Sequence, residues 1–379
     1  MPPRTLLIGC LVLAALAAAV FAARSGAAPA AEPAIALLPS FQPPAGADGA
    51  SLVEDRGWTY DSALAVIAYA TAGRTKRAGE LLAQLSELQN PDGSLDGSYS
   101  LTGGAGDKVI RGGVIAWTAA AATRYRDFAC SGSYDQLLRG TVRWLLNNRD
   151  MRRGSATYGM VLGGPGMDSI AAEHNLVASA AFAHALDETG GSSRGCKLPL
   201  RGLPRRQLAR ANRLLDAAIN RTLLARDDAG RVTAIRQGPA DDAIALDAQA
   251  YGALWLIRHG RLEDARRVID NADRLMLLAR PDGRVGYKPF AEPWGPDVLW
   301  TEGTLQMAFA KIRLGQRPGR LLREVRAWAA TSVPGMLLHS DRDDLGSPAG
   351  DYHRWPASAP AAWLTLSQAT LRHQDRRGS

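Results

Sequence analysis

The chain has 379 residues, of which 46% are hydrophobic and 22% are charged, and its formal net charge is +8. This composition suffices for a folded core, excludes a wholly disordered chain, and gives no support for a collagen-like, coiled-coil or multi-pass membrane protein. There are 66 alanines but only 24 aromatic residues, and 40 of the 45 basic residues are arginines. The alanine content favours closely packed helices, although a GC-rich genome also raises it.

The first 23 residues have the pattern of an export signal. Arg4 provides a short positive region, residues 6–23 are uncharged and apolar, and small residues follow. We expect a cleaved signal peptide and an exported protein, periplasmic or extracellular. About 18 apolar residues can also span a bilayer, so an uncleaved membrane anchor is an alternative. Residues 24–54 are rich in Ala, Pro and Gly and are predicted to form a tether.

The net positive charge favours acidic partners such as an anionic polysaccharide, or it reflects a solvated arginine-rich surface. Nucleic acid is not expected as a partner, because the chain is predicted to be exported and its arginines are scattered. No Cys/His set has metal-ligand spacing, and we expect neither a metal nor a cofactor. Cys130 and Cys196 would meet an oxidising compartment, in which they can pair.

From residue 55 onward, apolar stretches rich in small residues alternate with amphipathic stretches, and each stretch is predicted to be a helix. The apolar helices are expected at residues 61–72, 113–125, 171–186, 242–257, 299–314 and 357–371. The amphipathic helices are expected at residues 75–89, 134–148, 205–224, 262–278 and 320–330. The predicted domain is residues 55–372, followed by a polar tail at residues 373–379.

Alternating buried and amphipathic helices of this length describe stacked helical hairpins. Six buried helices can close into an inner ring with the amphipathic helices outside, which is an all-α (α/α)6 toroid. An open solenoid is the alternative, and the sixth outer helix has no counterpart in the sequence. Cys130 and Cys196 each lie in an inner-to-outer connection of adjacent hairpins, on the same face of a ring. We therefore predict that they form a disulfide, with two free buried thiols as the alternative.

Several short segments resemble the six-hairpin glycosidase-like toroids and, more distantly, the terpenoid cyclase and prenyltransferase toroids. The segments are Tyr60-Asp61-Ser62-Ala63-Leu64 with Gln89-Asn90-Pro91-Asp92-Gly93, Glu173-His174-Asn175-Leu176, Trp300-Thr301-Glu302-Gly303-Thr304 and Tyr352-His353-Arg354-Trp355-Pro356. The resemblance covers nearly all of residues 55–372. It implies the toroid fold and is weak for any one activity.

A terpenoid cyclase is a competing hypothesis. Asp341-Arg342-Asp343-Asp344 matches D-x-D-D, the acid motif of protonating cyclases, although the residues after it differ from that family. Carbocation chemistry needs a cavity lined with aromatic faces, and this chain has few aromatic residues. The cyclase therefore remains the less favoured interpretation.

In a toroid the N-termini of all inner helices lie on one face, where the helix dipoles are positive and a substrate would bind. Carboxylates interrupt the apolar helices near these starts, together with Trp and Tyr, which is the set that glycoside hydrolysis requires. We predict Glu302 as the acid and Asp61 or Asp247 as the base. The predicted substrate-binding residues are Glu173, His174, Trp58, Tyr60, Trp117, Trp300, His353 and Trp355.

Each of these carboxylates has a structural alternative, either as a helix cap or as part of a satisfied core network. The favoured function is an exported, carbohydrate-active enzyme, most simply a glycosidase-like hydrolase of polysaccharide or oligosaccharide, with a lyase or an epimerase also open. The alternative is a non-catalytic toroid that binds glycan or protein.

Overall fold

The computed structural model describes residues 35–104, 106–190, 196–293, 295–347 and 350–378. The predicted signal segment, residues 1–23, and the beginning of the predicted tether lie outside these residues. Within the part of the chain that the structure describes, no helix is long and apolar enough to cross a membrane.

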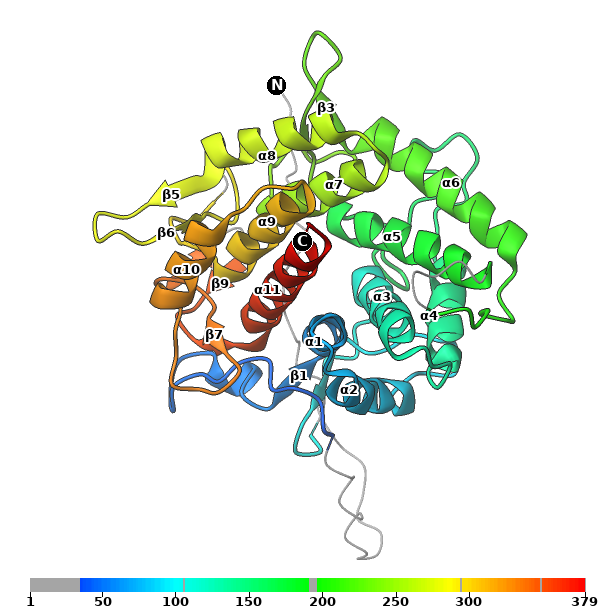
Figure 1. Cartoon of the computed structure of the whole chain (residues 1–379), viewed down its shortest axis with the longest axis horizontal. Helices are drawn as coiled ribbons and strands as arrows, with labels where there is room; N and C mark the ends of the chain where they lie inside the picture. Colours follow the sequence, from blue (N-terminus) through cyan, green and yellow to red (C-terminus); the bar gives the residue numbers. More distant parts are fainter. Residues whose placement is uncertain (1–34, 105, 191–195, 294, 348–349, 379) are drawn as a thin grey trace, which may run out of the picture. The chain divides into compact units, whose positions relative to one another are not determined.

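Six helices form an inner ring, which Figure 1 shows at the centre of the molecule. They are α1 (Thr59–Thr71), α3 (Gly112–Ala129), α5 (Ala172–Thr189), α7 (Leu246–Arg258), α9 (Thr301–Arg313) and α11 (Ser358–Gly378). Each inner helix packs against the next inner helix, and α11 packs against α1. The ring is therefore closed, which confirms the predicted toroid and excludes the open solenoid.

Outside the ring lie α2 (Thr75–Glu87), α4 (Asp135–Asn147), α6 (Arg205–Thr222), α8 (Leu262–Met276) and α10 (Gly319–Trp328). Their apolar stripes face inward, as in α2, where Leu81, Leu82 and Leu85 are buried. The inner helices are buried on nearly all sides, and their alanines allow the helices to approach closely.

Short antiparallel strand pairs, which the sequence did not predict, supplement the helices among the described residues. They are β1 (Arg56–Trp58) with β2 (Ser98–Ser100), β3 (Leu224–Arg226) with β4 (Val232–Ile235), β5 (Leu277–Ala279) with β6 (Val285–Tyr287), β7 (Leu337–Leu338) with β10 (Pro356–Ala357), and β8 (Asp344–Ser347) with β9 (Gly350–Tyr352). The turn between β5 and β6 contains Pro281-Asp282-Gly283. Gly283 has a φ of 88°, a backbone conformation that favours glycine.

One backbone hydrogen bond recurs at the start of every inner helix. The N–H of the first helical residue donates to a carbonyl in the loop that follows the next outer helix. These bonds run from Thr59 to Gly97, Gly112 to Gly163, Ala172 to Gln237, Leu246 to Pro289, and Thr301 to His339, over 2.8–3.0 Å. For α11 the acceptor is Ser40, at 3.0 Å, in the segment before α1. The N-terminal segment therefore takes the place of the missing sixth return loop.

The predicted tether is thus wrong for residues 35–54. Leu37 and Ser40 are buried, and Phe41 pairs with Ala357 beside β10. Composition suggested a flexible segment, but these residues close the ring between α11 and α1. A groove of about 460 Å³ lies between these two helices, the N-terminal segment and the loop at residues 333–336, and no sixth outer helix fills it among the described residues.

The C-terminal tail also differs from the prediction, because α11 continues to Gly378. His373 contacts the Thr71 carbonyl and Gln374 donates a hydrogen bond to the Ile312 carbonyl, so polar side chains tie the end of α11 to α1 and α9.

The predicted disulfide between Cys130 and Cys196 is confirmed. Cys130 follows α3, at the C-terminal end of this inner helix, and Cys196 is buried. One helical turn before Cys130, the buried Arg126 guanidinium pairs with Glu188 at 2.6 Å and with Asp135 at 2.9 Å. The face at the C-terminal ends of the inner helices thus carries a covalent link and a buried ion-pair network.

Candidate active site

The helix register brings four polar side chains together at the opposite face. Tyr60, Glu173, Asp247 and Glu302 are the second residues of α1, α5, α7 and α9, respectively. Because these helices begin at equivalent positions around the ring, their second residues converge. We call these four residues and the adjacent His174 the central site.

Glu302 is held by neutral donors. The Tyr60 hydroxyl donates a hydrogen bond of 2.5 Å to its Oε1, and Gln306 Nε2 donates to the same oxygen at 3.0 Å. Burial raises the pKa of Glu302 to about 8, with the Tyr60 hydrogen bond acting in the opposite direction and the charges of Asp61 and Glu173 adding to the rise. Glu302 is therefore protonated at neutral pH. Oε1 accepts both of these hydrogen bonds, and Trp363 donates a further one to the carboxyl group.

Glu173 and Asp247 form a second carboxyl pair, joined by a hydrogen bond. Burial raises the pKa of Asp247 well above its usual range, and the Glu173 charge raises it further. Burial also opposes ionisation of Glu173, but hydrogen bonds from His174 and Asp247 outweigh it and lower the pKa of Glu173. The surroundings of the pair thus favour a proton on Asp247 and a negative charge on Glu173.

His174 lies between the Glu173 carboxylate and helix α3. Its Nε2 is 3.1 Å from Glu173 Oε1. Its ring occupies the space beside Gly113, where an added Cβ would lie 2.1 Å from His174 Cδ2. Only glycine at position 113 leaves room for this ring. The Glu173 side chain is 41% exposed and that of His174 is 18% exposed, so solvent reaches this part of the central site.

Aromatic rings lie one helical turn below the central site. Trp117, Tyr251 and Trp363 are the sixth residues of α3, α7 and α11, and the centroids of their rings are 5.7–6.2 Å apart. The Tyr60 ring meets Trp117 edge-on at 5.4 Å, and Trp363 Nε1 donates to the Tyr60 hydroxyl at 3.1 Å. We call Trp117, Tyr251 and Trp363 the aromatic floor. Trp117 is its partly exposed member.

Tyr352, the last residue of β9, lies near the central site. Burial raises its pKa, and the charges of Asp247 and Glu302 raise it further. The ring stacks on His339 at 5.6 Å and meets Trp300 edge-on at 6.3 Å. Trp300, one of the predicted substrate-binding residues, therefore lies beside Tyr352.

Asp61, a predicted base, lies near enough to Glu302 for its charge to raise the Glu302 pKa, but its own hydrogen bonds are made where the ring closes. It is the third residue of α1, one position after Tyr60, and this step turns it by about 100° around the helix. Its carboxylate accepts a hydrogen bond from the Ser358 hydroxyl at 3.3 Å. Burial raises its pKa to about 6, against hydrogen bonds from Ser40 and Ser358. Asp61 therefore links the N-terminal segment, α1 and α11 where the ring closes.

Three other predicted binding residues also have packing contacts. The backbone N–H of Trp58 donates to the Ser40 hydroxyl at 2.8 Å, in the same region as Asp61. His353 and Trp355 stack on each other with centroids 3.6 Å apart, and Trp355 is buried beside Gly49. Trp58, His353 and Trp355 thus bind the N-terminal segment and the loop before α11 to the ring.

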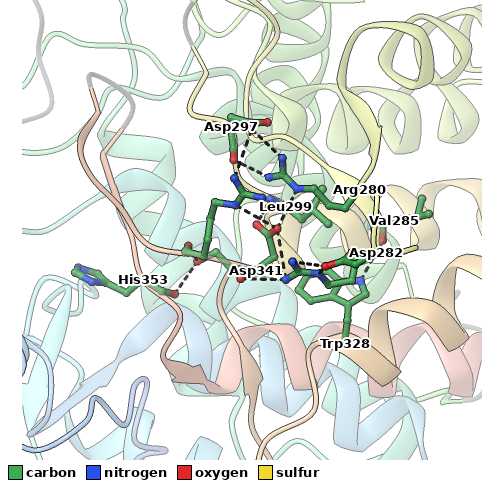
Figure 2. A network of polar contacts seen from close by, with 11 residues as sticks. Arg280, Asp282, Val285, Asp297, Leu299, Trp328, Asp341 and His353 are labelled. Carbon is green, nitrogen blue, oxygen red and sulfur yellow. Dashed lines mark hydrogen bonds and ion pairs between the residues drawn. The ribbon is translucent and has the colours of Figure 1, made fainter.

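The D-x-D-D segment contains a structural carboxylate. Asp341 is fully buried and lies 3.1 Å from Arg280, with Arg284 and Arg342 within 3.7 Å. Figure 2 shows this network, in which Asp341 also accepts the Leu299 N–H at 2.7 Å. Asp341 is thus ion-paired and fixes the segment just before α9 at Leu299, three residues before Glu302. It is not the free acid that the cyclase hypothesis requires.

Sequence reasoning missed Tyr251, Gln306, Tyr352 and Trp363. Tyr251 and Gln306 follow Asp247 and Glu302 by four residues, and this spacing places side chains on the same helix face. Searching four residues beyond each first-turn carboxylate would have found both. Tyr352 comes from a loop, where no periodicity operates. Among the described residues, no group of three or more His, Cys, Asp and Glu side chains could hold a metal ion.

Comparison with protein-family models finds no match, and comparison with curated proteins finds none either. Solved structures do match. A glycosidase with a glutamate-to-alanine substitution, in complex with glucose, gives a TM-score of 0.64 at 12% identity, covering 89% of this chain and 92% of that chain. A D-mannose isomerase gives 0.56 at 11% identity, covering 85% and 88%. The cellobiose 2-epimerase of Bacillus thermoamylovorans B4167 gives 0.56 at 11% identity, covering 83% and 88%. The chain thus has the fold of the six-hairpin glycosidase-like (α/α)6 toroids.

Proposed function

We propose that this protein is an exported glycoside hydrolase that cleaves a polysaccharide or oligosaccharide at the central site. The observation that carries this proposal is the convergence of Glu173, Asp247 and Glu302 at the starts of three inner helices, in surroundings that shift the pKa values of Glu302 and Glu173 in opposite directions. Glu302 is protonated at neutral pH, whereas Glu173 is ionised. Glycoside hydrolysis needs one carboxylic acid and one carboxylate on either side of the scissile bond.

Glu302 is the general acid of this proposal. Its carboxyl group donates a proton to the glycosidic oxygen as the bond to the anomeric carbon breaks, and the leaving sugar departs as an alcohol. Tyr60 and Gln306 fix the carboxyl orientation through Oε1. The hydrogen bond from Tyr60 also stabilises the carboxylate that remains after proton transfer.

Glu173 is the carboxylate that removes a proton from the attacking water or attacks the anomeric carbon itself. Its exposure gives water a route to it, and the hydrogen bond from Asp247 holds its orientation. Asp247 takes the supporting role and not that of the base, because its own carboxyl group is protonated. Trp117, as the partly exposed ring of the aromatic floor, is the surface on which a sugar would stack.

The comparisons support a carbohydrate substrate, since the structurally similar proteins include a glycosidase, an isomerase and an epimerase of sugars. Export is supported by the apolar segment at residues 6–23 and by the disulfide between Cys130 and Cys196, a bond typical of oxidising compartments. Cell fractionation tests it: recovery from the cytoplasm with reduced cysteines would contradict export.

A screen of the purified protein against neutral, amino and acidic polysaccharides, with detection of released reducing ends, tests the activity. Glu302→Gln removes the transferable proton, and we expect a loss of about 10²–10⁴-fold in kcat. Gln136→Glu is the matched control, because it makes the reverse exchange on the outer helix α4; its activity should equal that of the wild type.

Equal activity in Glu302→Gln and the wild type would contradict the assignment of the acid. Binding of a glycan without release of reducing ends would favour the non-catalytic toroid. Conversion of a reducing sugar to its epimer or isomer would assign the site to that chemistry instead.

A further inference from the structure

Carboxyl groups gather in the central site, whereas the chain as a whole is basic. The net charge of the chain is +8. In the central site, however, Glu173, Asp247 and Glu302 meet, and the basic side chain that contacts one of them among the described residues is His174, beside Glu173. The donors to Glu302 are the uncharged Tyr60, Gln306 and Trp363. The basic character of the surface therefore does not extend to this site.

Arginine neutralises buried carboxylates elsewhere in the same fold. Asp341 has Arg280 at 3.1 Å, and Glu188 has Arg126 at 2.6 Å. The chain contains 40 arginines, so their absence from the ion pairs of the central site does not follow from scarcity. Sites that recognise a carboxylate ligand typically offer an arginine that binds it through two hydrogen bonds.

Resting on the proposed function, we propose that the central site accepts an uncharged or amine-bearing sugar residue and excludes a uronate, with Glu173 as the residue that sets this preference. A uronate carboxylate would have to leave water beside Glu173 and compete with it for His174, without gaining an arginine partner from the described residues, and these effects weaken binding. A sugar ammonium group would instead be attracted by Glu173 and by the face of Trp117.

Calorimetric titration of the full chain at pH 6 with glucose, glucosamine and glucuronate tests this preference, with galactose, galactosamine and galacturonate as a second series. In the series that binds, the uronate should have a Kd at least about tenfold higher than the neutral sugar, and the amino sugar should bind at least as tightly.

Glu173→Gln should reduce the difference between neutral sugar and uronate by about tenfold, since it removes the negative charge and keeps the shape. Glu173→Asp keeps the charge and should keep the preference, which separates charge from a loss of folding. Glu263→Gln is the matched control: this carboxylate is 73% exposed at the start of outer helix α8, and its removal should leave the preference unchanged.

A uronate that binds the wild type as tightly as the neutral sugar would overturn the inference and leave the proposed hydrolase intact. An unchanged preference in Glu173→Gln would overturn the role of Glu173. If no sugar of either series binds and the polysaccharide screen also shows no release of sugar, the proposed function and this inference both fall.

Discussion

Glu302 is partly buried and Asp341 is fully buried, and each lies within two residues of the paired residues Trp300 and Ser340, yet their surroundings differ in kind. Asp341 is within 4 Å of three arginines and accepts a hydrogen bond from the Leu299 N–H. Glu302 receives hydrogen bonds from the uncharged Tyr60 and Gln306. Arginine keeps a buried carboxylate ionised and structural, whereas neutral donors in a buried site leave it protonated and able to transfer a proton.

The largest effect on stability should come from Asp341→Ala. Removing Asp341 leaves Arg280 with only the exposed Asp297 as its carboxylate partner and frees the segment before α9, so the free energy of unfolding should fall by about 3–5 kcal/mol. Urea denaturation measures this loss. Glu302→Gln is the comparison variant and should not be destabilised, because it replaces a neutral acid with a neutral amide. A loss below about 1 kcal/mol for Asp341→Ala would contradict the structural role.

Asp61 sharpens the comparison, because it is buried with serine partners and no arginine. Its pKa in the folded chain is about 6, above the ordinary 3.8. The native state thus binds more protons between these values, and the stability present below pH 3.8 is lost as pH rises through 6. Asp61→Asn lacks this titration, so its stability relative to the wild type should increase by about 2 kcal/mol between pH 4 and pH 7.

Urea denaturation of both proteins at each pH measures this difference. Asp48→Asn, at an exposed carboxylate of the N-terminal segment, controls for a general change of charge. If the difference between Asp61→Asn and the wild type does not change with pH, Asp61 is not a buried titrating group.

The sequence predicted the ring because its evidence is periodic. Alanine-rich apolar stretches at regular spacing can be satisfied only by helices buried on all sides, so the inner helices, the outer helices and their closure all followed. The pairing of Cys130 with Cys196 followed from the same geometry. The N-terminal segment escaped prediction because Leu37 and Ser40 act through single tertiary contacts, which composition does not reveal.

The candidate site was predicted in part for a related reason. The carboxylates Glu173, Asp247 and Glu302 were recognisable as polar residues within apolar helices. Asp61 has the same appearance in the sequence, but a shift of one residue along α1 turns it from the centre of the ring to the place where the ring closes. Deciding between these positions requires the exact start of each helix, which sequence patterns do not define.

The central claim is that Glu302 is protonated at neutral pH by virtue of its surroundings. Titration of its carboxyl carbon by ¹³C NMR, identified by its absence in Glu302→Gln, measures this directly and needs no substrate. We predict a midpoint of about 8, and a higher midpoint in Tyr60→Phe, because the hydroxyl lowers the pKa of Glu302. A midpoint near the ordinary 4.5 would contradict the account, since Glu302 would then be ionised at neutral pH and could not act as the acid.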